Sequence, residues 1–467
     1  MTSPSPKPVV CVQGLGFVGA AMALAVANAS NPDGSPAFAV IGVDLPTPEG
    51  QRRIDEINAG RFPFACIDSL LEKAAQAARD RGNLTATADP IVYEKASVAI
   101  VDVHLDVRTV NGVATADMTG FRSAIRTLGE RLPLGALIIV ETTVPPGTTA
   151  KIAAPELESA LHARGLPLDA ILLAHSYERV MPGPDYLQSV VHFWRVYAGH
   201  TEASGAACRD FLSKVIDVER FPLTQLKSTT ASETAKVLEN SYRAVNIAFM
   251  DEWSRFAECV GVDLFEVVDA IRVRPTHNNI RQPGLGVGGY CLTKDPHFAP
   301  IAAREIFGLP HLAFPFSTQA VAINAATPMA AVSRLEQLLG GSLRNQRVLL
   351  LGVAYRSDVA DTRFSPSEPF VRAVMEKGAS VVCRDPLVTY WDELSLPISA
   401  ELPSPADFDA VVFAVPHSAY RDIDVPEWIG DARCAVLDVN RVLSPSTVAT
   451  LRNRGARVAA TGVGESA

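Results

Sequence analysis

The chain has 467 residues, of which 48% are hydrophobic, and a formal net charge of −9. At roughly 100–200 residues per domain, this length predicts two to four packed domains, and the hydrophobic fraction excludes global disorder. The acidic balance excludes nucleic acid and anionic membranes as expected partners, because binding to phosphates needs clustered Lys and Arg.

The N-terminal part alternates between apolar strands and helical stretches. Residues 8–13 predict a buried strand, followed by a glycine loop and a helix that ends near Asn28. Further strands are predicted at 38–44, 97–103 and 136–142. Continuously apolar strands separated by helices predict a doubly wound parallel sheet that is covered on both faces.

The alternation of strands and helices stops at residue 228, in the middle of the chain. Residues 229–260 contain no Gly or Pro and show helical periodicity, which predicts one long helix that ends at Gly261. Asp263 is expected to cap the next short helix. We expect the long helix to form a central spine and a homodimer contact.

A second α/β series follows a linker predicted at 340–346. Its strands are expected at 347–355, 380–386, 410–415 and 435–440. The fold class is therefore α/β, with two Rossmann-like parallel-sheet domains joined by the long helix and a small helical domain.

The glycine loop has the spacing of a dinucleotide-binding turn. Gly14, Gly16 and Gly19 stand between a strand and a helix whose first residues are Phe17 and Val18. These glycines permit a tight turn, close approach to a pyrophosphate and close helix packing. Asp44 ends the next strand and is expected to accept the ribose hydroxyls, which favours NAD over NADP. The alternative is a glycine turn without a dinucleotide.

Residues 283–296 (PGLGVGGYCLTKDP) carry the candidate nucleophile, Cys291. The glycines before Cys291 indicate backbone close to a ligand, and Lys294 would favour the thiolate. From spacing alone, Cys291 is equally compatible with a small packed side chain. On the long helix, Lys236 and Asn240 share a face and could stabilise an oxyanion, although a solvated helix face is the alternative.

The cysteines show no pairing pattern. The seven are widely spaced and contain no CxxC pair, which argues against a disulfide framework and against a metal site. This usage predicts a reducing compartment, the cytoplasm.

Five ordered segments resemble the UDP-glucose/GDP-mannose dehydrogenase family along nearly the whole chain. They are GLGFVG (14–19), ETTVPPGTT (141–149), ETAKVLENSYRAVNIAF (233–249), PGLGVGGYCLTKDP (283–296) and LLGVAYRSDVADTRFSPS (350–367). The resemblance implies an NAD-binding domain at 1–215, a helical dimerising and catalytic domain at 216–338 and a UDP-sugar-binding domain at 339–467.

The resemblance also implies the reaction. The C6 alcohol of a UDP-sugar becomes a carboxylic acid while two NAD⁺ are reduced, through a thiohemiacetal and then a thioester on Cys291. Lys236 and Asn240 would stabilise oxyanions, and Asp295 would activate the hydrolytic water. The resemblance also places Thr143 near that water and the cofactor, and Glu178 at the sugar and the hydrolytic step. It places Gly288, Tyr355 and Arg356 beside the UDP-sugar. Arg363 would lie at the cofactor and Arg53 at the adenosine end of the cofactor.

Several positions depart from the family pattern. Tyr177 replaces a Pro before Glu178, residues 103–107 (VHLDV) replace a cofactor-contacting strip, and Tyr290 precedes Cys291 in place of the commoner His or Ser. His277 lies where a partner-subunit arginine is expected, with Arg274 as a possible substitute. Pro182 stands where glucose-type members carry a second Glu.

Two sugars and two other functions remain open. ETTVPPGTT, ERVMPG and PGLGVGG favour a UDP-N-acetylhexosamine, whereas GGYCLTKD favours UDP-glucose. One rival is a single-oxidation β-hydroxyacid dehydrogenase, which would need Lys236 and Asn240 but no thiol and no second α/β domain. The other is a non-catalytic nucleotide-sugar-binding protein of the same fold, which the altered strip at 103–107 would suit.

Overall fold

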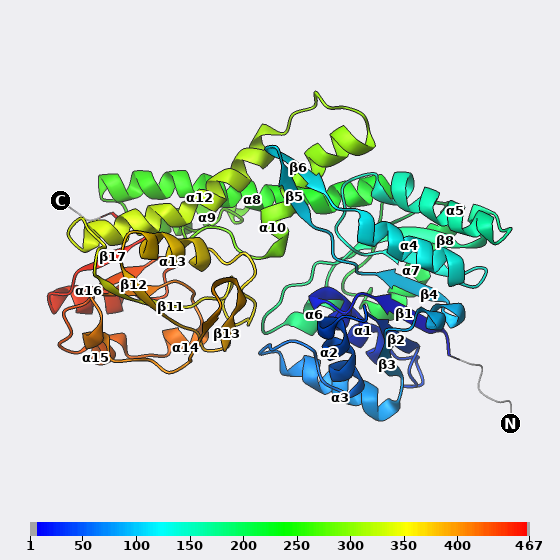
Figure 1. Cartoon of the computed structure of the whole chain (residues 1–467), viewed down its shortest axis with the longest axis horizontal. Helices are drawn as coiled ribbons and strands as arrows, with labels where there is room; N and C mark the ends of the chain where they lie inside the picture. Colours follow the sequence, from blue (N-terminus) through cyan, green and yellow to red (C-terminus); the bar gives the residue numbers. More distant parts are fainter. Residues whose placement is uncertain (1–6, 465–467) are drawn as a thin grey trace. The chain divides into compact units, whose positions relative to one another are not determined.

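The computed structural model describes residues 7–464, and these residues form two compact units. The first unit contains the chain up to Glu239 together with His297–Ala313, and the second contains Asn240–Pro296 and the chain from Phe314 onward. Each unit is built on its own parallel or largely parallel sheet (Figure 1). The expected three-part division at residues 215 and 338 stays a prediction.

The first unit holds an eight-stranded sheet in the order β10-β9-β8-β7-β4-β1-β2-β3. All neighbours are parallel except β8 and β9, which run antiparallel, so the expected parallel sheet is wrong at this one pair. Its strands are β1 (Val9–Gln13), β2 (Ala39–Val43), β3 (Leu84–Thr87), β4 (Val98–Val101), β7 (Leu137–Val140), β8 (Leu172–Tyr177), β9 (Val196–Gly199) and β10 (Thr224–Gln225).

Strand register gathers the candidate cofactor residues at one sheet edge. Gln13 pairs with Val43 and with Val101, and Val101 pairs with Val140, so these strands end side by side. The residues that follow them therefore share the carboxyl edge, where ligands bind in doubly wound sheets. The surrounding helices are α1 (Phe17–Asn28), α2 (Pro48–Asn58), α3 (Ser69–Arg81), α4 (Thr119–Arg131), α5 (Ala154–Ala163), α6 (Tyr186–Val191), α7 (Glu202–Val215) and α11 (Phe298–Ile301).

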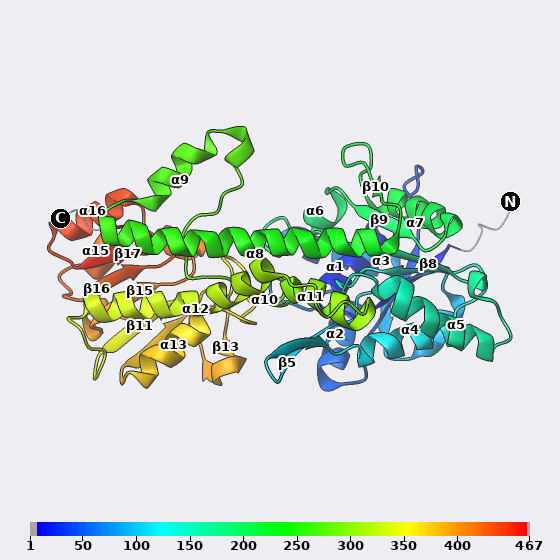
Figure 2. The ribbon, with the colours of Figure 1, turned by 90° about the horizontal axis from the view of Figure 1, so that it is seen from above.

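The long helix is present as predicted. Helix α8 (Thr229–Val260) runs without interruption, and Figure 2 shows it along its whole length. Gly261 ends it with φ +79°, a left-handed conformation that glycine adopts without strain. Asp263 caps α9 (Leu264–Arg272), accepting a hydrogen bond from the Phe265 backbone N–H at 2.9 Å, as expected. In the second unit, α12 (Pro315–Leu338) packs against α8 through small alanines.

The second unit holds a five-stranded parallel sheet in the order β12-β11-β15-β16-β17. Strand β11 ends at Leu351, four residues earlier than expected, because Gly352 adopts φ +102° and leaves no room for a Cβ beside Val415. The other elements are α10 (Tyr290–Lys294), β12 (Ser380–Arg384), α13 (Ser367–Glu376), β13 (Tyr390–Trp391), β14 (Leu396–Pro397), β15 (Ala410–Phe413), α14 (Ser418–Arg421), α15 (Val425–Ile429), β16 (Ala435–Asp438), α16 (Pro445–Asn453) and β17 (Val458–Ala460).

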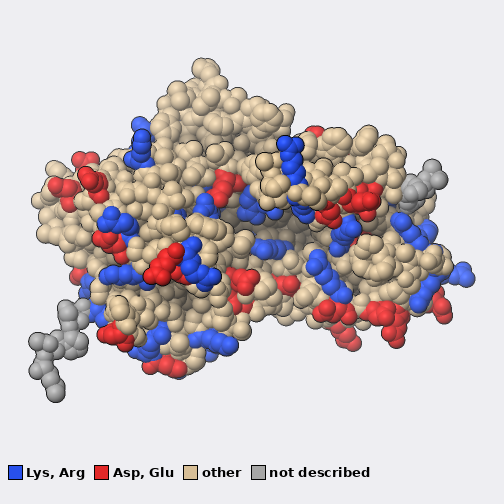
Figure 3. Space-filling model, turned by 180° about the vertical axis from the view of Figure 1, so that it is seen from behind, with Lys and Arg blue, Asp and Glu red and all other residues tan. Residues whose placement is uncertain are grey.

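The departing strip at 103–107 leads into a small hairpin. Strands β5 (Val107–Val110) and β6 (Val113–Ala116) are joined by Asn111 and Gly112, both at positive φ, the pattern of a two-residue hairpin turn. Leu105 of the strip is buried in the core of the first unit. On the face drawn in Figure 3, Lys and Arg side chains are interspersed with Asp and Glu. Between residues 7 and 464, no helix is both long and apolar enough to cross a membrane.

A buried ion pair underlies the carboxyl edge of the first sheet. Arg195 and Glu141 form a salt bridge with side chains only 3% and 2% exposed. Asp102, which follows β4, is half-buried, and its Oδ2 atom is buried. Burial, followed by the charge of Glu141, holds the pKa of Asp102 well above its usual range, so Asp102 is neutral. Arg195 therefore balances the one buried carboxylate of this group.

Replacing Arg195 by Met should lower the free energy of unfolding by about 3–5 kcal/mol, because Glu141 would be left as an uncompensated buried charge. Arg209→Met is the matched control, since its pair with Asp210 has side chains 53% and 67% exposed. That exposed pair should contribute little to the free energy of unfolding, because water screens it. Urea denaturation measures both changes, and equal shifts in the two variants would contradict the assignment.

Candidate active site

The glycine loop is shaped by two different demands. Gly14 adopts φ +95°, and a Cβ there would lie 2.4 Å from the backbone oxygen of Asp102. A Cβ on Gly19 would lie 1.9 Å from the Gly14 oxygen, whereas a Cβ on Gly16 would meet no atom within 4 Å. Gly14 and Gly19 are thus required by backbone packing within the protein. Gly16 leaves open space at the start of α1, beside Phe17 and Val18, which fits a bound pyrophosphate.

Asp44 lies at the same edge and is already partnered. Its Oδ2 accepts hydrogen bonds from the Leu15 backbone N–H at 3.2 Å and from Arg53 Nε at 2.7 Å. Arg53 also pairs with Glu49 through Nη1 at 3.2 Å. Glu49 pairs with Arg52 as well, through Nη2 at 2.8 Å. A carboxylate such as Asp44 at this edge suits ribose hydroxyls and disfavours a 2′-phosphate, as expected for NAD.

Lys236 is buried on α8 with its ammonium held in place. Its Nζ donates to the backbone oxygen of Glu178 at 2.7 Å and approaches Glu178 Oε1 at 3.2 Å. The second carboxylate oxygen, Oε2, accepts a short hydrogen bond from the Val180 backbone N–H. The solvated-face alternative for Lys236 is therefore wrong, because the side chain is paired and only 7% exposed as a residue.

Tyr177 supplies an aromatic face next to these groups. The Lys236 ammonium and the Arg179 guanidinium each lie 5.4 Å from its ring centroid. Burial, followed by the charge of Glu239, raises the pKa of Tyr177 to about 12, so the ring stays neutral. Burial and then the Lys236 charge lower the pKa of His175 to about 3. The positive charge of Lys236 thus faces the Glu178 carboxylate, and the imidazole of His175 is neutral.

Thr143 lies in a loop that a buried acid anchors. Glu233 accepts hydrogen bonds from the backbone N–H groups of Gly147 and Thr149, both at 2.6 Å. At the start of the loop, Thr142 Oγ1 donates to the backbone oxygens of Val101 and Val103 at 3.0 and 2.9 Å. The half-buried Thr143 is therefore fixed at the carboxyl edge of the sheet.

In the second unit, Asp295 joins the cysteine segment to α8. Its Oδ2 accepts from Asn240 Nδ2 at 2.7 Å and its Oδ1 from Lys294 Nζ at 2.8 Å. Asp295 has no exposed surface, whereas Cys291 on α10 is exposed. The thiol is thus presented outward on a turn whose neighbouring acid is buried and paired.

Tyr290 and Tyr355 complete the surroundings of the thiol. The Lys294 ammonium lies 4.6 Å and the Arg363 guanidinium carbon 5.7 Å from the centroid of the Tyr290 ring. A Cβ on Gly289, whose φ is +82°, would lie 2.7 Å from Tyr355 Cε2. A Cβ on Gly288 would likewise lie 2.8 Å from Tyr355 Cβ. Both glycines therefore let the cysteine segment pack on Tyr355.

Two arginines near Tyr355 differ in their availability. Arg363 is paired with Asp361 through Nε and Nη2, at 2.9 and 2.7 Å. Arg356 is exposed, and within residues 7–464 no hydrogen bond or ion pair holds its guanidinium. Burial, followed by the charge of Asp361, raises the pKa of Tyr355 to about 12, so its hydroxyl stays protonated. The Arg356 guanidinium is thus available to bind a phosphate group.

The predicted residues divide between the units. Gly14, Gly16, Phe17, Val18, Gly19, Asp44, Arg53, Thr143, Glu178 and Lys236 belong to the first, and Asn240, Gly288, Cys291, Asp295, Tyr355, Arg356 and Arg363 to the second. Glu233 and His175 were missed, although Glu233 lies only three residues before Lys236. In the part of the chain that the structure describes, no group of three or more His, Cys, Asp or Glu is placed to hold a metal.

Three domain models of the UDP-glucose/GDP-mannose dehydrogenase family match this chain. The NAD binding domain matches residues 9–215, the central domain 230–326 and the UDP binding domain 349–445. The UDP-N-acetyl-D-mannosamine dehydrogenase of Methanocaldococcus jannaschii is 30% identical over 416 residues, which cover 89% of this chain and 87% of that protein. An NDP-N-acetyl-D-galactosaminuronic acid dehydrogenase of Ralstonia solanacearum is 29% identical over 427 residues, covering 89% and 92%.

A solved structure shows the same architecture. The UDP-D-ManNAc dehydrogenase of Pyrococcus horikoshii superimposes with a TM-score of 0.81 at 26% identity, covering 97% of this chain and 99% of that one. The structure of an NDP-N-acetyl-D-galactosaminuronic acid dehydrogenase from Methanosarcina mazei gives a TM-score of 0.77 at 26% identity, covering 98% and 96%. The predicted fold class is confirmed.

Gly16→Ala should weaken NAD⁺ binding at least about tenfold and leave the melting temperature unchanged, because its Cβ would enter only the space meant for the pyrophosphate. Gly19→Ala should instead lower the melting temperature, since its Cβ would collide with the backbone of Gly14. Calorimetric titration and thermal unfolding separate the two effects. Tight NAD⁺ binding by Gly16→Ala would show that the open space holds something else.

Proposed function

Because the chain belongs to the UDP-glucose/GDP-mannose dehydrogenase family and is an NAD-dependent UDP-sugar dehydrogenase, we propose that it acts on a UDP-N-acetylhexosamine through Cys291. The observation that carries the role of Cys291 is the outward thiol beside the buried Asn240–Asp295–Lys294 group. The sugar assignment is supported by relatives that are named for N-acetylated sugars.

The glycine loop and Asp44 would hold the cofactor. Bound NAD⁺ accepts a hydride in each of the two oxidations. Lys236 would stabilise the alkoxide that forms as the C6 hydroxyl loses its proton, because a buried ammonium stabilises developing negative charge more strongly than an exposed one. Asn240 would donate to the same oxygen, and Glu178, already bonded to Lys236, would orient that ammonium.

Cys291 would carry the aldehyde to the acid. Its thiolate forms a C–S bond with C6, and the carbonyl oxygen becomes an oxyanion that gains a proton. Loss of a hydride from C6 and of the hydroxyl proton to solvent then restores the carbonyl as a thioester. Water attacks this carbonyl, the C–S bond breaks, and the thiolate and the carboxylic acid are released. Asp295 would take the proton of that water, directly or through a second water. The family resemblance assigns Thr143 and Glu178 to the same hydrolytic step.

The rival functions differ in what they require. A single-oxidation β-hydroxyacid dehydrogenase would lack the second α/β domain, yet residues 347–460 form a complete five-stranded sheet. A non-catalytic binding protein does not agree with the named dehydrogenases that match along the chain. UDP-glucose remains the second candidate substrate, favoured by the residues GGYCLTKD around Cys291.

A panel of UDP- and GDP-hexoses and N-acetylhexosamines tests the sugar. We expect kcat/KM to be highest for a UDP-N-acetylhexosamine, by at least about tenfold over UDP-glucose, a difference of about 1.4 kcal/mol in transition-state binding. NADH absorbance measures the rates. A preference for UDP-glucose would move the assignment to the second candidate without affecting the reaction class.

Cys291→Ser should reduce net acid formation by at least about a hundredfold, because a hydroxyl at ordinary pH supplies almost none of the nucleophilic anion. Cys259→Ser is the matched control, since Cys259 is also an exposed cysteine and has no proposed role. Chromatography of the sugar nucleotide product checks both variants. Near wild-type acid formation by Cys291→Ser would remove the covalent role.

We also propose a homodimer that forms through α8. Five apolar side chains spaced along one face of this helix are 45–56% exposed: Tyr242, Phe249, Trp253, Phe256 and Val260. The rings of Phe249, Trp253 and Phe256 form a chain, with centroids 6.2 Å apart for Phe249 and Trp253 and 5.7 Å for Trp253 and Phe256. A contiguous apolar stripe of this kind is typical of a subunit contact. The cytoplasm stays the proposed location, because NAD chemistry and seven cysteines that form no disulfide bond suit it.

Phe256→Asp should convert the dimer to a monomer, because it places a charge in the centre of the proposed contact. Leu134→Asp is the control, since Leu134 is 65% exposed and lies outside α8. Light scattering coupled to gel filtration gives the mass of each. An unchanged dimer in Phe256→Asp would place the contact elsewhere.

A further inference from the structure

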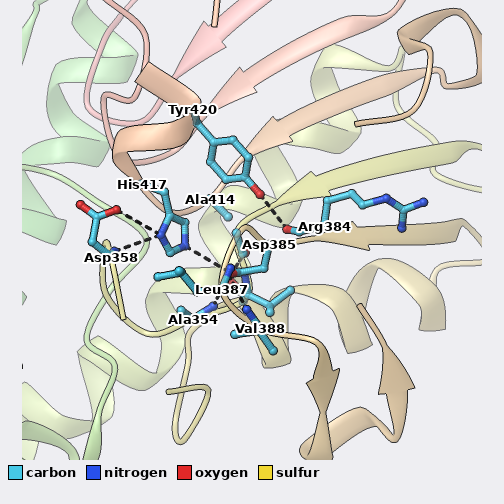
Figure 4. A network of polar contacts seen from close by, with 12 residues as sticks. Ala354, Asp358, Arg384, Asp385, Leu387, Val388, Ala414, His417 and Tyr420 are labelled. Carbon is cyan, nitrogen blue, oxygen red and sulfur yellow. Dashed lines mark hydrogen bonds and ion pairs between the residues drawn. The ribbon is translucent and has the colours of Figure 1, made fainter. Parts of the chain in front are cut away.

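A buried histidine and a buried acid lie behind the loop that carries Tyr355 and Arg356. His417 and Asp385 have no exposed surface, and His417 Nε2 lies 3.1 Å from Asp385 Oδ2 (Figure 4). Asp385 follows β12, and His417 precedes α14. Neither residue has a part in the chemistry proposed for Cys291, so their burial calls for another explanation.

Asp385 holds the first half of the loop through its backbone. Its Oδ2 accepts hydrogen bonds from the N–H groups of Val353 at 2.9 Å and Ala354 at 3.1 Å, directly before Tyr355. Its Oδ1 accepts from Leu387 and Val388. Burial alone would raise the pKa of Asp385, but the bonds from His417 and from these N–H groups outweigh it and lower the pKa. Asp385 is therefore a carboxylate.

His417 holds the second half of the loop. Its Nδ1 accepts a hydrogen bond from the backbone N–H of Asp358 at 3.0 Å. A backbone N–H can only donate, so Nδ1 carries no proton, and Nε2 must donate its proton to Asp385. The geometry thus requires a neutral imidazole. Asp358 itself adopts φ +60°, and its Oδ1 accepts from the Ser418 N–H and hydroxyl, both at 3.0 Å.

From this geometry we infer that Asp385 and His417 are positioning residues for UDP-sugar binding, because each holds one half of the loop that carries Tyr355 and Arg356. This inference rests on the proposed role of Tyr355 and Arg356. A side chain without an acceptor in place of Nδ1 would leave the Asp358 N–H unpaired, and residue 358 would have to rearrange to find another partner.

Charged and aromatic groups surround the imidazole. Asp358 and Asp385 face it from two loops, and Tyr420 packs edge-on from α14 with ring centroids 5.6 Å apart. The Tyr420 hydroxyl donates to the Arg384 backbone oxygen, and the Arg384 guanidinium donates to the backbone oxygen of Glu401. The imidazole is thus held on several sides by protein groups and has no exposed surface.

Calorimetric titration at a fixed pH tests this inference in the full-length protein without NAD⁺, with UDP-N-acetyl-D-mannosamine and UDP-glucose as probes. His417→Leu removes the acceptor for the Asp358 N–H. We expect its Kd to rise roughly tenfold, as when the binding-competent state falls to about a tenth of the population. His417→Asn keeps an acceptor for this N–H, so its Kd should change less than about twofold.

Binding of NAD⁺ separates a positioning role from general damage, because the glycine loop and Asp44 belong to the first unit. Its Kd should be the same in the wild type, His417→Leu and His417→Asn. An unchanged Kd for the UDP-sugars in His417→Leu, or an equal loss of NAD⁺ binding, would overturn the inference. Absence of binding for both UDP-sugars in the wild type would instead contradict the proposed function, so the two failures are distinguishable.

Discussion

The hydrogen bonds that Asn240 and Lys294 donate to Asp295 are the interactions on which the account of this enzyme depends. Asp295 is fully buried, and a buried carboxylate is stable only when its oxygens are paired. One donor lies on α8 and the other on α10, so the same pair of bonds fixes the turn that presents Cys291. On the other side of that turn, Gly288 and Gly289 lie against Tyr355. The thiol and the loop proposed to bind the nucleotide are therefore held by one packed structure.

In the first unit, buried charged groups are likewise paired, with different residues. Lys236 is paired with Glu178, Glu233 with two backbone N–H groups, and Arg195 with Glu141. Each pairing orients a polar group before any ligand arrives, which reduces the reorganisation that a reaction must otherwise pay for. Gly16 and Arg356 are different. Gly16 leaves open space in front of the backbone, and the charge of the exposed Arg356 has no acidic partner among the described residues. These two positions are where we expect phosphate groups to bind.

Local pattern was sufficient to predict most of the fold. Apolar runs located β1, β4 and β7, and the absence of Gly and Pro located α8 to within one residue of its start. The antiparallel pairing of β8 with β9 was not predictable from either strand, because direction depends on the path of the connection between them. The early end of β11 depends on Gly352 and on Val415, which lie far apart in the sequence.

The site was predictable only where residues form a motif. The glycine loop and the cysteine segment are contiguous, and Lys236 and Asn240 are one helical turn apart. His417 and Asp385 are 32 residues apart in segments without a recognisable pattern, so only the structure reveals their contact. Tyr177 was noticed as a departure, but its contact with the Lys236 ammonium required the folded chain.

The central claim is that one active site carries the same sugar carbon through two oxidations with Cys291 as the covalent carrier. The most direct measurement is the amount of NADH formed per molecule of sugar product, with the product identified by mass spectrometry. The account predicts two NADH for each carboxylic acid and no free aldehyde. One NADH per product, with an aldehyde or ketone released, would contradict it.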